Sequence, residues 1–357
     1  MTQDQVRLRL EAAEGSLSPY AMTTALSRGR DVPEPPSPIR TEFQRDRDRI
    51  IHTKAFRRLK HKTQVFIAPQ GDHFATRLTH TLEVAQIGRT IARALNLNED
   101  LEEAICLGHD LGHTPFGHVG EETMGDLVSG GFRHNRHSLR VVEVLEKVGK
   151  GLNLTWEVRH GIVNHSKPRG DFLGKEVSEG LSLEAQICRI SDAVAYLNHD
   201  LADAIRAGLL SEDDLPESVK HVLGTRHAQR IDTMVTDIVE ASWKCTGENV
   251  AKKGRPTVRM SPRVRSALNL LREFLFENIY LPESRGEESQ RAREVITFLY
   301  QYFVEHYRDI PEEYWVREES HEQMAVDYIS GMTDRYALRL AERLSPGISQ
   351  GTFAGRV

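Results

Sequence analysis

The sequence has 357 residues, enough for one large domain or two smaller ones. Hydrophobic residues make up 39% and charged residues 28%, and the net charge is −5, values typical of a soluble globular protein. The negative charge argues against extensive non-specific binding to nucleic acid. No run approaches the ~18 uninterrupted apolar residues that a membrane span needs.

The N-terminal residues and the cysteines indicate in which cellular compartment the protein is expected. The first residues, MTQDQVRLRLEAAEG, contain no continuous apolar stretch, so we expect no signal peptide. Cys106, Cys188 and Cys245 lie far apart and form no CxxC pair, which predicts reduced thiols, with Cys106 and Cys188 buried. We therefore expect a cytoplasmic protein that does not attach to a membrane.

The periodicity of apolar residues predicts an all-α fold in three parts. Residues 1–43 are polar and proline-rich, and we interpret them as an arm or linker. Residues 44–210 show helical spacing, as in Leu183, Ile187, Ile190 and Val194, with Asn98 or Asp100 as a helix cap. Residues 211–357 contain three further amphipathic segments, and we expect a helical region that shapes the pocket or builds an oligomer.

Most of the 16 histidines lie between His52 and His199, and four residues in this region are of the kind that binds metals. They are His80, His109, Asp110 and Asp192. The His-Asp pair at a helix end directs two ligands into one space, and Asp192 lies on an apolar helix face, where an unpaired carboxylate is costly to bury. Two imidazoles and two carboxylates suit Mg²⁺, Mn²⁺, Fe²⁺, Co²⁺ or Ni²⁺, so the sequence predicts a catalytic metal site.

The order H…HD…D, together with longer motifs, resembles a known family. The motifs GHDLGHTPFGHVGEE, GFRHNRHSLRVVE and SLEAQICRISDAVAYLNHDLADA are similar to those of the bacterial deoxyguanosinetriphosphate triphosphohydrolase-like branch of the HD superfamily. The resemblance covers about Arg45 to Gly208. It implies an HD-domain helical bundle with Mg²⁺ or Mn²⁺ as the first candidates for the metal. The reaction it implies is hydrolysis of dGTP or several dNTPs to the deoxynucleoside and inorganic triphosphate.

The resemblance also implies residue roles. It assigns the metal to His80, His109, Asp110 and Asp192, the chemistry at the phosphate to His113, His118, Glu121 and His134, and the substrate to Gln64, Arg77, Tyr196 and Asp200. The other interpretations are structural: His118 as a turn cap, Glu121 as a solvated acid and Tyr196 as a core aromatic. The sequence departs from the family pattern at Arg133, where an acid is commoner.

Charge and family suggest partners beyond the dNTP substrate. Nine Lys and Arg stand against three acids between Arg40 and Lys62, which favours phosphate contacts. The family implies a homo-oligomer built from dimers, with a hexamer as one candidate, and a nucleotide effector. The basic segment KKGRPTVRMSPRVR favours weak contacts with single-stranded nucleic acid. The alternatives are an HD nucleotidase or phosphodiesterase on mono- or cyclic nucleotides, and a nucleotide- or single-strand-binding regulator without turnover.

Overall fold

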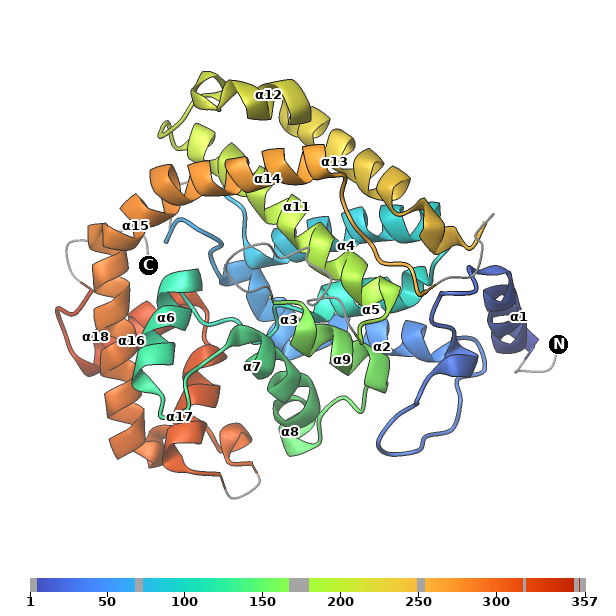
Figure 1. Ribbon diagram of the computed structural model, residues 1–357. Helices are drawn as coiled ribbons and strands as arrows, with labels where there is room; N and C mark the ends of the chain where they lie inside the picture. The colour runs from blue at the N-terminus through green and yellow to red at the C-terminus, as the bar shows by residue number, and fades with distance from the viewer. Residues whose placement is uncertain are drawn as a thin grey trace. The chain divides into compact units, whose positions relative to one another are not determined.

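The computed structural model describes residues 5–67, 73–166, 180–248, 254–316, 319–349 and 353 (Figure 1). Throughout these residues the regular secondary structure is helical, with two isolated extended bridges, Arg30 with Thr155 and Thr63 with Thr76. The predicted all-α fold is confirmed. No helix among these residues is long and apolar enough to cross a membrane.

The chain divides into two compact units, each built from three separate segments. The first unit contains residues 1–51, 81–109 and 153–275, and the second contains residues 52–80, 110–152 and 276–357. The predicted boundaries at residues 43 and 210 stay a prediction. The structure adds that segments far apart in sequence share each core.

The helices of the first unit are α1 (Gln5–Ala13), α2 (Glu42–Ile51), α5 (Glu99–Gly108), α9 (Trp156–Asn164), α11 (Leu183–Arg206), α12 (Glu217–Leu223), α13 (His227–Ala241) and α14 (Pro262–Leu275). The helices of the second unit are α3 (Lys54–Arg58), α6 (Gly117–Leu127), α7 (His134–Arg140), α8 (Glu146–Gly149), α15 (Leu281–Arg285), α16 (Glu287–Glu305), α17 (His321–Ser330) and α18 (Asp334–Leu344). Helix α4 (Arg77–Ala94) contributes its first turn to the second unit and its remainder to the first.

Helix α11 lies at the centre of the first unit, where it packs against α5, α9, α13 and α14. It begins at Ser182, whose hydroxyl accepts a hydrogen bond from the Ala185 backbone N–H. The side chain of Asn98 caps α5, as the sequence predicted, by accepting from the backbone N–H groups of Asp100 and Leu101. Asn98 is itself fixed, because its backbone N–H donates to the buried carboxylate of Glu184 at 3.3 Å. These two caps set where α5 and α11 begin, and α5 ends at Gly108, directly before the His-Asp pair.

The N-terminal segment is bonded to its own unit through a buried ion pair. The guanidinium of Arg30 contacts the carboxylate of Asp46, which is fully buried on α2. Asp46 also accepts from the backbone N–H of Thr155 at 2.8 Å and from its hydroxyl at 2.7 Å. Burial raises the pKa of Asp46 even though Arg30 and Thr155 oppose it. The segment that we predicted as an arm is also held to its own unit before Arg30, because the carbonyl of Ser16 accepts from the side chain of Asn96 at 2.9 Å.

The core of the second unit forms where α16 packs against α6, α17 and α18. Phe116 and Met124 come from the stretch that follows the His-Asp pair, and both are buried in the same cluster as Leu299 and Ile329 of the C-terminal helices. Arg140 on α7 binds Asp327 on α17 through two hydrogen bonds of 2.7 Å. The C-terminal helices are thus part of the framework that positions the predicted catalytic turn.

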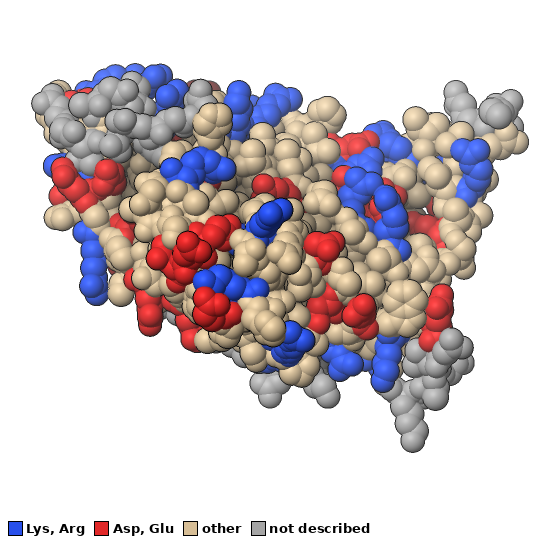
Figure 2. All heavy atoms as spheres, turned by 90° about the horizontal axis from the view of Figure 1, so that it is seen from above, with Lys and Arg blue, Asp and Glu red and all other residues tan. Residues whose placement is uncertain are grey.

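The cysteines and the charged surface residues can be compared with what the sequence predicted. Cys106, Cys188 and Cys245 are buried and form no disulfide, which confirms the prediction for the first two. On the face shown in Figure 2, basic and acidic side chains are interspersed among the described residues. Two lysines of the predicted nucleic-acid segment, Lys252 and Lys253, lie outside the described residues.

The Arg30–Asp46 pair gives a test of the fold. We expect Asp46→Ala to lower the free energy of unfolding by about 3 kcal/mol, because it leaves the buried N–H of Thr155 without its acceptor and removes one of the two carboxylates that pair with Arg30. The control is Asp48→Ala on the same helix, which removes a part-exposed pair with Arg40 and should cost about 1 kcal/mol or less. Urea denaturation followed by circular dichroism measures both. Equal losses for the two variants would contradict this role of Asp46.

Candidate active site

The first turn of α4 brings two predicted site residues to Asp110. Nη1 of Arg77 donates to Oδ2 of Asp110 at 2.7 Å, and Nε2 of His80 lies 4.0 Å from the same oxygen. All three side chains are buried. Nε and Nη2 of Arg77 are also buried and have no hydrogen-bond partner among the described residues. A buried guanidinium with free donors is suited to an anionic ligand such as phosphate.

His109 precedes Asp110 in the chain, and a backbone carbonyl of the first unit determines its tautomer. Its Nδ1 lies 2.6 Å from the carbonyl oxygen of Cys106. A carbonyl can only accept, so Nδ1 carries the proton and the lone pair of Nε2 stays available for a metal. The ring of His165 packs edge-on against His109, with centroids 4.9 Å apart. His80, His109 and Asp110 therefore each offer a donor atom of a kind that binds divalent ions.

A left-handed turn follows the His-Asp pair. Phe116 and Gly117 have φ values of 62° and 55°, a conformation that a bulky residue rarely adopts. Two contacts hold it: the backbone N–H of Phe116 donates to Asp334 at 3.0 Å, and Nζ of Lys62 donates to the carbonyl of His113. These contacts fix the turn from which His113 and His118 project.

His134 and Glu121 form a hydrogen-bonded pair within this unit. Nδ1 of His134 lies 2.8 Å from Oε1 of Glu121, and the backbone N–H of His134 donates to the same oxygen at 2.9 Å. Nε2 of His134 then lies 3.9 Å from Oδ1 of Asp110. The imidazole is thus oriented by one carboxylate and presents its other nitrogen beside a predicted metal ligand, an arrangement suited to acid–base chemistry.

The two stacked histidines of the site differ in charge. The rings of His113 and His134 lie 4.7 Å apart. Burial, followed by the charges of Arg77 and His134, lowers the pKa of His113 well below its usual range. Burial also opposes a charged His134, but the hydrogen bond and charge of Glu121 outweigh it and raise its pKa. The surroundings therefore favour the neutral form of His113 and the protonated form of His134.

Gln64 and His118 complete the predicted set in the second unit. Gln64 is buried, and its Oε1 has no hydrogen-bond partner among the described residues. His118 is exposed at the start of α6, and its ring lies 5.8 Å from that of His113. Ligand-type atoms of His113, His118 and Glu121 all lie within 4.8 Å of one another. The structure thus brings together the four residues predicted for chemistry at the phosphate.

Helix α11 carries the other predicted residues, Asp192, Tyr196 and Asp200, which all belong to the first unit. Burial, reinforced by the charges of Asp192 and Asp200, raises the pKa of the Tyr196 hydroxyl, so this group stays protonated. Nδ1 of His199 lies 2.8 Å from Oδ1 of Asp200. The helix therefore presents a phenol and two carboxylates that act on one another electrostatically.

Sequence reasoning missed four residues that support the site: Lys62, His165, Asp327 and Asp334. We expected the C-terminal region to shape the pocket or build an oligomer and named no site residue in it, yet Asp334 accepts from Phe116, and Asp327 lies 3.9 Å from His137. Lys62 was counted only as one member of a basic run. No local motif marks these residues, because their partners lie far away in the sequence.

Gly117 provides the first test of the site. A Cβ at this position would lie 2.8 Å from the backbone oxygen of Gln64 and 3.3 Å from Nη2 of Arg77. We expect Gly117→Ala to lower kcat/KM by about 10²-fold, because both predicted substrate residues must shift. Gly125→Ala on the same helix is the control, since its Cβ meets only a contact of 3.8 Å. Equal values of kcat/KM for the two variants in steady-state kinetics would refute the assignment of Gln64 and Arg77 to substrate binding.

The Glu121–His134 pair predicts a change in the pH profile. Glu121→Gln removes the charge that stabilises the imidazolium, so the pKa of His134 should fall. The limb of the pH dependence of kcat/KM that reports His134 should move to lower pH, and the maximal rate should drop. Glu122→Gln is the neighbouring control, because Glu122 is exposed and pairs with Arg293 at 2.5 Å. A limb that stays in place would remove His134 from this role.

Two family models match the chain. The HD domain model matches residues 77–197, which hold all four predicted metal ligands, and the phosphohydrolase-associated domain model matches residues 258–343. An HD domain implies a bound divalent metal ion, and the residues around the His-Asp pair can hold one.

Relatives across nearly the full chain bear one description, deoxyguanosinetriphosphate triphosphohydrolase-like protein. One from Caldanaerobacter subterraneus subsp. tengcongensis is 52% identical, over 94% of this chain and 95% of the relative. One from Desulfatibacillum aliphaticivorans is 47% identical, over 92% and 94%, and one from Clostridium tetani is 48% identical, over 94% and 95%. This chain is therefore an HD phosphohydrolase, and it belongs to the family of deoxyguanosinetriphosphate triphosphohydrolase-like proteins.

Proposed function

We propose that this protein hydrolyses deoxynucleoside triphosphates, either dGTP or several dNTPs, to the deoxynucleoside and inorganic triphosphate. The observation that carries the proposal is the surroundings of Asp110, which touches a buried arginine with free donors and lies beside an oriented histidine. An anion-binding group next to an acid–base pair is what phosphate-ester hydrolysis requires. The family supports the triphosphate as the substrate.

The metal ligands in this proposal are His80, His109, Asp110 and Asp192, with Mg²⁺ or Mn²⁺ as the ion. A bound divalent ion would neutralise charge on the phosphate and position the attacking water. The protonation of His109 at Nδ1 supports its part, because the nitrogen that a metal needs stays unprotonated. Arg77 has the complementary task of holding a phosphate oxygen with the donors that Asp110 does not use.

The different protonation states favoured at His113 and His134 divide the proton transfers between them. Water attacks the α-phosphorus, the bond from phosphorus to the 5′-oxygen breaks, and that oxygen must gain a proton. His134 is the proposed donor, because Glu121 keeps it protonated and directs its Nε2 into the site. Neutral His113 can hydrogen-bond the phosphate or accept a proton from water, and His118 is proposed to contact the phosphate from α6.

Three residues are proposed to bind the nucleoside part and the phosphates. Gln64 is assigned to the deoxyribose, which its unsatisfied side-chain oxygen supports. Tyr196 is assigned to phosphate, and its raised pKa keeps the hydroxyl as a donor. Asp200 is assigned to the 3′-hydroxyl as an acceptor. The homo-oligomer, the nucleotide effector and the contacts with single-stranded nucleic acid stay predictions.

Product identification tests the proposal. Purified protein with Mn²⁺ or Mg²⁺ is incubated with each dNTP, alone and mixed, and the products are separated by ion-exchange chromatography. We expect deoxynucleoside and intact triphosphate. Cleavage of mono- or cyclic nucleotides alone would replace the substrate class, and bound metal without turnover of any nucleotide would favour the regulator.

Two variants used in this assay separate metal binding from proton transfer. We expect His134→Ala to keep its metal but to lose about 10²-fold or more in kcat, the usual scale for a lost acid–base group. Asp110→Ala should lose both metal and activity while keeping its helix content. Metal content by atomic emission and helicity by circular dichroism distinguish the two outcomes, and full activity in Asp110→Ala would defeat the metal assignment.

A further inference from the structure

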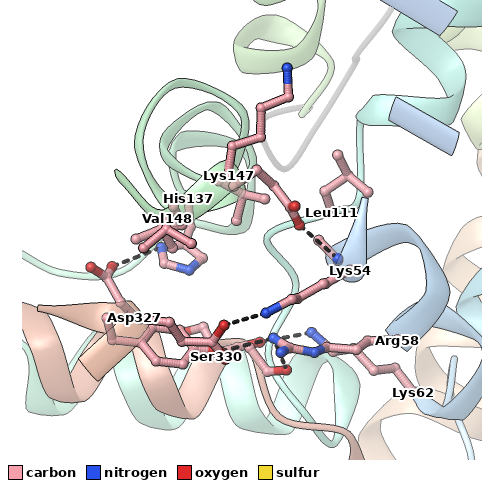
Figure 3. Close-up of a pocket in the computed structure, with 16 residues that line it drawn as sticks. Lys54, Arg58, Lys62, Leu111, His137, Lys147, Val148, Asp327 and Ser330 are labelled. Atoms are coloured by element: carbon pink, nitrogen blue, oxygen red, sulfur yellow. Dashed lines mark hydrogen bonds and ion pairs between the residues drawn. The ribbon is translucent and has the colours of Figure 1, made fainter. Parts of the chain in front are cut away.

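A cavity of about 90 Å³ lies within the second unit, beside the residues that support the catalytic turn (Figure 3). Its walls come from three parts of the chain, residues 54–62, 111–148 and 313–331. At about 10–15 Å³ for each water-sized position, the cavity holds roughly six to nine non-hydrogen atoms. That space fits a small oxyanion such as phosphate or a short carboxylate, and it excludes a nucleotide.

Several charges around the cavity already cancel. Lys54 pairs with Glu313 at the rim, and Asp327 is bound by Arg140 through two hydrogen bonds of 2.7 Å. The Lys147 side chain points away from Arg58 and Lys62 in Figure 3. The charge inside the cavity therefore depends on the remaining charged groups of its walls.

Those remaining groups are two cations, Arg58 and Lys62, and one acid. Nη1 of Arg58 donates to the hydroxyl of Tyr314 at 2.9 Å and to the carbonyl of Gly331 at 3.1 Å. Nζ of Lys62 donates to the carbonyls of His113 and Ser330. Among the described residues neither cation pairs with a carboxylate. The acid, Glu146, accepts a hydrogen bond from the Ala55 backbone N–H at 2.9 Å, so the interior keeps a surplus of positive charge.

Burial makes this surplus costly. Lys62 is 2% exposed, and its burial, followed by the charge of Arg58, lowers its pKa to about 7. An ammonium group has three N–H donors, and only two of them are used by the two carbonyls. An anion in the cavity would accept the third bond and offset the repulsion between Lys62 and Arg58.

The rim of the cavity is strained on the side formed by α8. Lys147 and Val148 both have φ of 54°, which is an outlier for a β-branched residue such as valine. The Val148 side chain is also 68% exposed, although it is apolar. Strained backbone of this kind is concentrated at ligand clamps and switch regions.

We propose that this cavity is a binding site for a small oxyanion of the phosphate or carboxylate class, held by Arg58 and Lys62. The site is separate from the one at Asp110, and its occupant is too small to be the substrate. Lys62 connects it to catalysis, because the same ammonium group that would bind the anion holds the backbone carbonyl of His113. An occupied site therefore fixes the turn that carries His113, and this link to turnover rests on the proposed function.

Isothermal titration calorimetry with inorganic phosphate, and separately with acetate, tests the binding. The full chain carries Arg77→Met and Asp110→Ala, so that the proposed active site does not contribute. We expect one saturable site for at least one of the two anions. Adding Arg58→Met should weaken it about tenfold or more, the effect of losing a charge-assisted hydrogen bond, and Arg308→Met at the surface should leave it unchanged.

Ala55→Leu is a second variant that removes no hydrogen bond from a side chain. Ala55 lines the cavity, so a leucine there fills the space and should abolish binding even if Arg58→Met is poorly folded. The absence of saturable binding for both anions overturns the proposal, as does binding that survives Ala55→Leu. In the protein with an intact active site, the bound anion should change kcat at saturating dNTP, whereas competition at the active site changes KM alone. A lost kcat effect with retained binding would separate the anion site from its link to His113.

Discussion

The carboxylate of Asp334 is the contact on which the catalytic turn of the second unit depends. Its Oδ2 accepts from the backbone N–H and the hydroxyl of Thr63, at 3.0 and 2.6 Å, and its Oδ1 accepts from the backbone N–H of Phe116. One buried side chain thus joins the segment before α4, the turn after the His-Asp pair and the start of α18. Without it, the backbone N–H groups of Thr63 and Phe116 would both lose their acceptor.

The same arrangement explains why the C-terminal helices accompany the HD residues. Phe116 and Met124 are buried among side chains of α16, α17 and α18, so the turn has no core of its own. Lys62 adds a second link, from the carbonyl of His113 to that of Ser330 at the end of α17. The region matched by the phosphohydrolase-associated model therefore positions backbone atoms of the turn, while the side chains that we propose to be catalytic lie in the HD segment.

The sequence predicted the parts of this structure that depend on local pattern. Helical spacing indicated the all-α fold, and the Asn98 cap followed from a local pattern. The grouping of His113, Glu121 and His134 followed from the family resemblance. The supporting contacts could not be predicted, because Thr63 and Asp334 lie 271 residues apart. Such pairings depend on tertiary packing, which no local pattern of one sequence encodes.

His113 and His134 show that the residue type alone does not determine the pKa of an imidazole. Their rings stack 4.7 Å apart, yet one has its pKa lowered and the other raised. The difference arises from their partners, because His134 donates to Glu121 whereas Nδ1 of His113 has no hydrogen-bond partner among the described residues. A protonated and a neutral imidazole side by side can give a proton and accept one without rearrangement of the backbone. The rigid turn held by Asp334 and Lys62 preserves that difference, since a shift of His113 would change the field that each ring exerts on the other.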